Sequence, residues 1–123
     1  EKAQVMSARR DTRAKAAIPR DELTTRVPAL LAEIQADLFA RARQFRDDRT
    51  SHTASYEEFK ATMDGRPGFV VAPWCGDAAC EAAIKTETQA TIRNLPMQGG
   101  EVSGACVRCD APAREQAYFA KSY

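Results

Sequence analysis

Four cysteines constrain the fold of this chain more than any other feature. They form two pairs, Cys75-Gly-Asp-Ala-Ala-Cys80 and Cys106-Val-Arg-Cys109, with a long segment between them. Each pair forms a short turn that can place two thiolates on one side of a metal ion, and two such turns complete the closed tetrahedron that structural zinc requires. The spacing therefore predicts one structural zinc ion held by Cys75, Cys80, Cys106 and Cys109.

Disulfides, a redox role and an iron–sulfur role are the alternatives for these cysteines. Cytosolic proteins seldom keep disulfides. The first residues, EKAQVMSARRDTR, lack the apolar stretch of a secretory signal, and no window approaches 18 consecutive apolar residues. These observations favour a cytoplasmic location without membrane contact. A thioredoxin-like role for the second pair lacks the βαβ context that such a motif needs.

Length and composition predict one compact unit with one modest core. The chain has 123 residues, of which 44% are hydrophobic and 28% charged, as in ordinary globular domains. Its 18 basic and 17 acidic residues give a net charge of +1, which offers no general electrostatic reason to bind nucleic acid. The chain opens without a methionine and in strand-like sequence, so we expect a fragment of a longer protein.

The first half of the chain predicts a strand, a turn and a long helix. Residues 3–9 have strand-like composition, and RDTRAK after them resembles a hairpin tip. Over residues 21–48, apolar side chains recur at spacings of three and four, which indicates an amphipathic helix. Pro28 is tolerated best in the first turn of a helix, so Thr24 or Thr25 is the expected N-cap.

The second half predicts short helices alternating with strands. Ser55 and Glu58 form a capping box that opens a short helix ended by Gly65, and Asp77 caps another that runs to about Glu87. The predicted strands cover residues 69–74, 91–96 and 115–123, with a loop at residues 98–104. This order indicates an α+β fold: one small mixed β-sheet with helices packed on one face and one structural zinc site.

Six segments together resemble a known family. They are LLAEIQADLFARARQFRDDRT at 30–50, YEEFK at 56–60, GFVVAPWCGDAAC at 68–80, IKTETQATIRNLP at 84–96, CVRCDAPA at 106–113 and YFAKSY at 118–123. From about residue 23 onward, the chain resembles the C-terminal zinc-binding domain of class II prolyl-tRNA synthetases of the archaeal and eukaryotic type, a form also found in some bacteria.

The resemblance implies a non-catalytic structural domain of a homodimeric proline–tRNA ligase, which joins proline to tRNA(Pro) using ATP. The sites for proline, ATP and Mg would lie outside this fragment, which holds no catalytic residue. Residues 1–20 would continue from an upstream domain, and residues 21–123 would form the zinc-binding domain. In the family, cysteines at the positions of Cys75, Cys80, Cys106 and Cys109 bind the zinc.

The resemblance also gives Tyr123 a role, because family chains commonly end in a tyrosine whose carboxylate approaches the catalytic region. Trp74 is interpreted as a cover over the metal and the core, and His52 as a loop residue. The alternative function is a free-standing zinc-binding module for nucleic acid or protein. Its contact surface would be the basic side chains of Arg41, Arg43, Arg46 and Arg49.

Overall fold

The computed structural model describes residues 3–65, 68–97 and 102–122. It divides into two compact units, unit 1 (Glu1–Phe45) and unit 2 (Arg46–Tyr123). The expectation of a single compact unit is therefore wrong. One long helix, α1 (Leu23–Asp47), runs across the boundary between the two units.

Unit 1 begins with an antiparallel hairpin. Strand β1 (Gln4–Ala8) pairs with β2 (Lys15–Pro19), so that Val5 lies opposite Ile18. The predicted strand and hairpin tip are confirmed. At the tip, Arg13 has a positive φ of 66°, and its N–H donates to the Arg9 carbonyl. Strand β2 was not predicted, since KAAIP is rich in alanine and ends in proline, both depleted in strands.

Helix α1 begins earlier than its sequence predicts. A 3-10 turn, η1 (Arg20–Glu22), leads directly into α1, which starts at Leu23 and not after a cap at Thr24 or Thr25. Pro28 consequently lies inside the helix, beyond its first turn, and one backbone hydrogen bond is missing there. The prediction that Pro28 occupies the first turn is therefore wrong.

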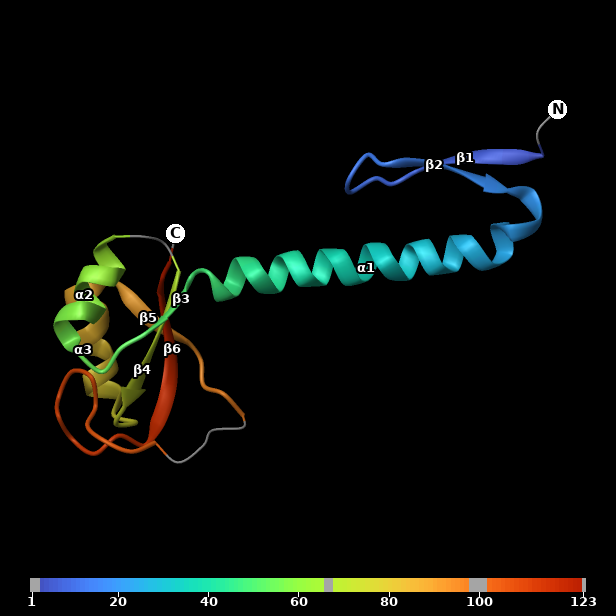
Figure 1. Cartoon of the computed structure of the whole chain (residues 1–123). Coiled ribbons are helices and arrows are strands. Elements are labelled where there is room, and N and C mark those ends of the chain that lie inside the picture. The colour runs from blue at the N-terminus through green and yellow to red at the C-terminus, as the bar shows by residue number, and fades with distance from the viewer. Residues whose placement is uncertain (1–2, 66–67, 98–101, 123) are drawn as a thin grey trace. The chain divides into compact units, whose positions relative to one another are not determined.

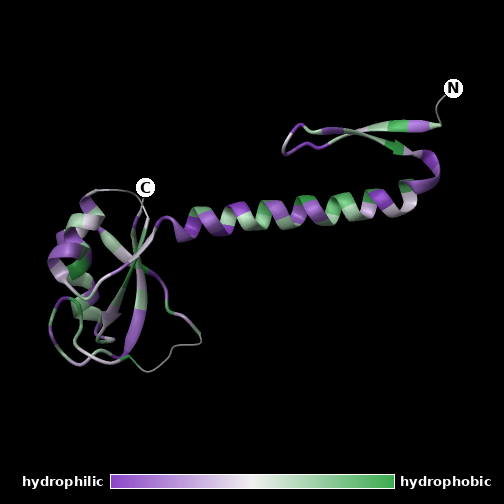
Figure 2. Ribbon diagram, in the orientation of Figure 1, coloured by the Kyte–Doolittle hydropathy of each residue, from purple (hydrophilic) through white to green (hydrophobic). Residues whose placement is uncertain are grey.

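Apolar residues recur along α1 (Figure 2), yet none of its residues is buried. Leu31 is 62% exposed, Leu38 46% and Phe39 63%. A helix of this kind normally gains its stability by burying its apolar face against another element. Unit 1 does not provide enough surface to do so.

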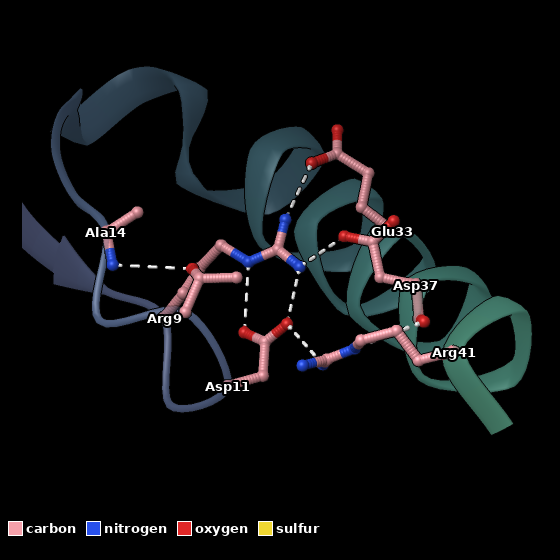
Figure 3. A network of polar contacts seen from close by, with 7 residues as sticks. Arg9, Asp11, Ala14, Glu33, Asp37 and Arg41 are labelled. Atoms are coloured by element: carbon pink, nitrogen blue, oxygen red, sulfur yellow. Dashed lines mark hydrogen bonds and ion pairs between the residues drawn. The ribbon is translucent and has the colours of Figure 1, made fainter. Parts of the chain in front are cut away.

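Polar contacts fasten the hairpin to α1 (Figure 3). The Arg9 guanidinium donates to the Asp11 carboxylate at 2.8 Å and to the Asp37 carboxylate at 2.6 Å, and lies 3.8 Å from Glu33. Arg41 also donates to Asp11, at 3.3 Å. Hydrogen bonding from Arg9 lowers the pKa of Asp11 to about 2, so this carboxylate is ionised at neutral pH. We call these five side chains the Arg9 network.

Unit 2 is an α+β layer structure (Figure 1). Its elements are β3 (Thr50–His52), α2 (Tyr56–Asp64), β4 (Phe69–Trp74), α3 (Ala78–Thr88), β5 (Ala90–Asn94) and β6 (Glu115–Lys121). The sheet has the order β3-β4-β6-β5, with β3 and β4 parallel and the other pairs antiparallel. The predicted mixed sheet with helices on one face is confirmed.

The core of unit 2 lies between this sheet and the helices α2 and α3. Alternate residues of the two central strands, such as Ala72 and Phe119, face the helices and are completely buried. The Phe59 ring of α2 meets the Phe119 ring edge-on, with 5.1 Å between the centroids. The alternation predicted for β6 therefore reflects real burial, whereas β4, predicted from its β-branched and aromatic run, is buried almost throughout.

In unit 2, the predicted caps of α2 and α3 are present, whereas one short strand was missed. Ser55 caps α2, which ends at Gly65, and Asp77 caps α3 by accepting a hydrogen bond from the Ala79 N–H at 2.7 Å. His52 lies in β3 and not in a loop, because its segment forms a short parallel pair with β4. Of the predicted loop at residues 98–104, the segment 98–101 lies outside the described residues, and residues 102–104 form no helix or strand.

Candidate metal centre

The first cysteine pair spans the junction between β4 and α3. Cys75 directly follows the end of β4, and Cys80 lies in the first turn of α3. Gly76 between them has a φ of +83°, a conformation that favours glycine. Asp77 then caps the helix, so both thiols are presented by well-defined backbone. This arrangement was predicted from the sequence.

The second pair lies in a tight turn, the knuckle, formed by residues 104–113. Its two ends are joined by a bridge between Ala105 and Pro112 and by a hydrogen bond from the Ala113 N–H to the Gly104 carbonyl. Inside, the Cys106 N–H donates to the Ala111 carbonyl at 2.7 Å. These bonds fix the backbone on both sides of the cysteines.

A backbone contact at the end of β4 brings the two pairs together. The Val107 N–H of the knuckle donates to the Pro73 carbonyl at 2.9 Å. Strand β3 pairs with β4 only as far as Val71, so the missing N–H of Pro73 removes no ladder bond with β3 and its carbonyl remains available. This role of Pro73 was not predicted from the sequence, in which its position two residues before Cys75 is its signal.

The four sulfurs form a compact cluster. All four Sγ atoms lie within 4.8 Å of one another, with 3.6 Å between Cys75 and Cys109 and 3.8 Å between Cys80 and Cys106. A tetrahedron with metal–sulfur bonds of about 2.3 Å has edges of about 3.8 Å. A disulfide needs about 2.05 Å, and all four cysteines are free. Four sulfurs at these distances could hold one metal ion.

Burial makes Cys75 and Cys80 poor acids in the absence of a cation. Burial raises the pKa of Cys75 and of Cys80 above that of an ordinary thiol. Burial also acts on Cys106, but hydrogen bonds from the backbone N–H groups of Arg108 and Cys109 outweigh it and lower its pKa to about 7. Cys106 is therefore the first of the three to ionise, and a bound cation would have to displace the remaining protons.

The other residues singled out from the sequence lie in different surroundings. Trp74 is buried in the core cluster beside Cys75, as predicted, although its Nε1 has no hydrogen-bond partner among the described residues. His52 is exposed and does not belong to the sulfur cluster. Tyr123 lies outside the described residues.

The basic side chains proposed for the alternative function are engaged at least in part. Arg41 pairs with Asp11, and Arg46 pairs with Asp47 at 2.5 Å. In the described parts of the chain, no second group of three or more metal-ligating side chains occurs. Among the helices described there, none combines the length and the apolar character needed to cross a membrane.

Comparison with known proteins places this centre in a family. The family model described as "Prolyl-tRNA synthetase, C-terminal" matches residues 56–123, which include all four cysteines. Proline--tRNA ligase 2 of Bacillus thuringiensis subsp. konkukian (strain 97-27) is 42% identical over 123 residues, 100% of this chain and 26% of that protein. Proline--tRNA ligase of Lachnospira eligens is 42% identical over 120 residues, 98% of this chain and 25% of that protein.

A solved structure agrees with these relatives. Prolyl-tRNA synthetase from Cryptosporidium parvum, complexed with halofuginone and AMPPNP, superposes with a TM-score of 0.90 at 29% identity, over 99% of this chain and 26% of that one. The chain thus spans about a quarter of the length of the relatives it matches. With more than half of its residues matched by the family model, the chain belongs to the family of prolyl-tRNA synthetase C-terminal domains.

Proposed function

We propose that this chain is the C-terminal part of a class II enzyme that joins proline to tRNA(Pro) using ATP. The observation that carries the proposal is the 42% identity to a proline–tRNA ligase over the whole chain, together with the family match at residues 56–123. The proline, ATP and Mg sites are assigned to the remainder of the parent enzyme. The chain itself supports architecture and positioning.

Aminoacylation by the parent tests this function. The purified parent should charge tRNA(Pro) with proline in the presence of ATP, and deletion of residues 46–123 should lower that activity. The fragment alone should show no salt-dependent RNA binding. A parent that charges a different tRNA, or RNA binding by the fragment that weakens with salt, would contradict the assignment.

We propose further that Cys75, Cys80, Cys106 and Cys109 bind one structural zinc ion. The donor set supports zinc because four thiolates at tetrahedral spacing form a closed site without a position for a reacting water. When bound, the ion would supply cross-linking and no chemistry. The chain's own part is to hold the end of β4, the start of α3 and the knuckle at one point.

Metal analysis tests the zinc assignment directly. Protein purified without added metal should contain about one zinc ion per chain, and its four thiols should resist alkylation under native conditions. A folded preparation with reactive thiols and no bound ion would overturn the assignment. Zinc in the absence of prolyl-tRNA synthetase activity would instead leave the metal site standing and remove the enzyme function.

The upstream connection is also part of this proposal. We assign residues 1–20 to the end of an upstream domain and residues 21–123 to the C-terminal domain. The exposed Leu31 and Leu38 on α1 support a missing neighbour, since the chain covers only 26% of its relatives. Replacing both leucines with glutamate should barely affect the isolated chain but should destabilise the parent.

The remaining assignments concern the whole enzyme. We propose a cytoplasmic homodimer of the archaeal and eukaryotic type, which the similarity to the Cryptosporidium parvum enzyme supports although bacterial relatives are also similar. We also propose that the Tyr123 carboxylate docks near the parent's catalytic region. Removing Tyr123 from the parent should lower aminoacylation without changing its zinc content, and unchanged activity would count against docking.

A further inference from the structure

Arg108 lies between the two cysteines of the knuckle, and its side chain reaches a different element. The turn that carries it is closed by a hydrogen bond from the Asp110 N–H to the Cys106 carbonyl at 3.3 Å. Its side chain donates to the Oε1 atom of Glu87, at 2.7 Å from Nη2 and 3.2 Å from Nε. A residue that stands between two candidate metal ligands is thus anchored by its side chain to a different element, α3.

Glu87 in turn connects α3 to α2. Its second oxygen, Oε2, accepts a hydrogen bond from the Tyr56 hydroxyl at 2.7 Å. A carboxylate in the last turn of a helix is disfavoured by the helix dipole, so Glu87 needs compensating donors. Arg108 and Tyr56 provide them, and hydrogen bonding from Arg108 lowers the pKa of Glu87. We call these three residues the Glu87 cluster.

We propose that the Glu87 cluster positions the knuckle for metal binding, so that Cys106 and Cys109 already face Cys75 and Cys80 before the ion arrives. This inference rests on the proposed metal site and adds to it three residues that do not themselves bind the ion. Side chains that orient metal ligands commonly contribute about 10- to 100-fold to metal affinity. Arg108 is accordingly a positioning residue, with Glu87 as its anchor.

The alternative is an ordinary surface ion pair that only stabilises α3. The side chains of Arg108 and Glu87 are 30% and 40% exposed, and surface pairs of that kind contribute little to stability. The two interpretations differ in what they predict for the metal. Only positioning lowers metal affinity while the rest of unit 2 remains folded.

Metal titration of the full chain distinguishes them. Arg108→Gln and Glu87→Gln should each weaken Zn²⁺ binding, measured by competition with a chromophoric chelator, by about tenfold or more. The double variant should lose no more than the stronger single variant, because both changes break one contact. Lys121→Gln is the matched control: it breaks an ion pair with Asp64 at 3.0 Å, far from the cysteines in sequence, and should leave affinity unchanged.

Two further measurements exclude unfolding as the cause. The Co²⁺ complex of each variant should keep the absorption of a tetrahedral four-sulfur site, and Arg108→Lys should recover part of the affinity. With the metal removed from both proteins, the Cys106 and Val107 amides should exchange faster in Arg108→Gln than in the wild type, while the Phe119 amide should exchange at the same rate in both.

The possible failures are separable. Zn²⁺ affinity of Arg108→Gln within twofold of the wild type would overturn the positioning role and leave the metal site intact. Loss of Phe119 protection together with metal affinity in that variant would also overturn it, in favour of a stabilising role. Absence of Zn²⁺ and Co²⁺ binding by the wild type would remove the metal site itself.

Discussion

Unit 2 packs two helices against a four-stranded sheet, whereas unit 1 fastens a two-stranded hairpin to one long helix. Unit 2 has a contiguous apolar core that reaches the cysteines, and the candidate metal centre lies at its edge. In the described part of unit 1, Ile18 alone is buried, and the Arg9 network provides its most specific contacts.

The two units thus differ in what holds them together: apolar burial stabilises unit 2, whereas ion pairs orient the hairpin and α1 in unit 1. Apolar burial contributes most of the free energy of folding, while ion pairs contribute less but fix geometry. We infer that unit 2 has the means to fold on its own once metal is bound. Unit 1 relies on further contacts, which the remainder of the parent would provide.

Removal of the metal should have the largest effect and should affect unit 2 only. Structural zinc contributes on the order of 10 kcal/mol of apparent binding free energy, which is comparable with the net stability of a domain. After chelation, hydrogen exchange should accelerate in β4, β6 and the knuckle. Exchange in β1 and β2 should not change. Equal acceleration of exchange in both units would mean that the two units unfold cooperatively.

Truncation of an aromatic side chain should distinguish the units next. Phe119 of β6 is completely buried, so Phe119→Ala should lower the free energy of unfolding by about 3–5 kcal/mol. Phe39 of α1 is the matched control, and its replacement by alanine should change stability by less than about 0.5 kcal/mol. Urea denaturation of both variants provides the comparison. Similar losses would show that α1 is already covered.

A glycine in unit 2 tests how closely its backbone segments approach. A Cβ atom at Gly68 would lie 2.2 Å from the Arg49 carbonyl oxygen, which itself accepts a hydrogen bond from the Phe69 N–H. Gly68→Ala should therefore separate β3 from β4 and cost about 1–3 kcal/mol. Gly65→Ala, where the nearest atom would lie at 3.3 Å, should cost less. Thermal denaturation ranks the two variants, and the reverse order would contradict the packing described.

Loss of the Asp11 charge should produce the smallest effect, confined to unit 1. The pKa of Asp11 is about 2 in the folded chain, below its ordinary value of about 3.9. A lowered pKa stabilises the fold above about pH 4, and this contribution disappears as the pH falls through 2. The NMR signal of the Arg9 Nε–H group should shift over that range. In Asp11→Asn the shift should be absent, and its persistence would assign the titration to another carboxylate.

Local sequence signals predicted most elements of unit 2. Helices α2 and α3 were found from their caps, β6 from its alternating faces, and β4 from a β-branched and aromatic run bounded by turn residues. The sulfur cluster was also predictable, since four cysteines in two short turns leave few arrangements. Local sequence patterns predicted the structure correctly wherever residues that are close in sequence also contact one another in the fold.

The features that were missed depend on distant residues. Strand β3 is too short to show alternation, and it exists because β4 offers a free edge. The Arg9 network joins Arg9 to Asp37, and the Glu87 cluster joins Glu87 to Arg108. The partners are 28 and 21 residues apart in sequence, which is farther than local sequence patterns reach. The position of Pro28 in α1 was predicted wrongly because the backbone hydrogen bonds of the turns before and after it hold the helix together despite the one that is missing. In each case tertiary context outweighed local preference.

The strand order of unit 2 also limits the order in time in which its strands can pair during translation. Strands β4 and β5 leave the ribosome before β6, yet β6 lies between them. Until β6 emerges, β4 and β5 therefore lack the strand that lies between them in the folded sheet. Because the knuckle immediately precedes β6, binding of the ion by the nascent chain would bring β6 between β4 and β5 and complete the sheet.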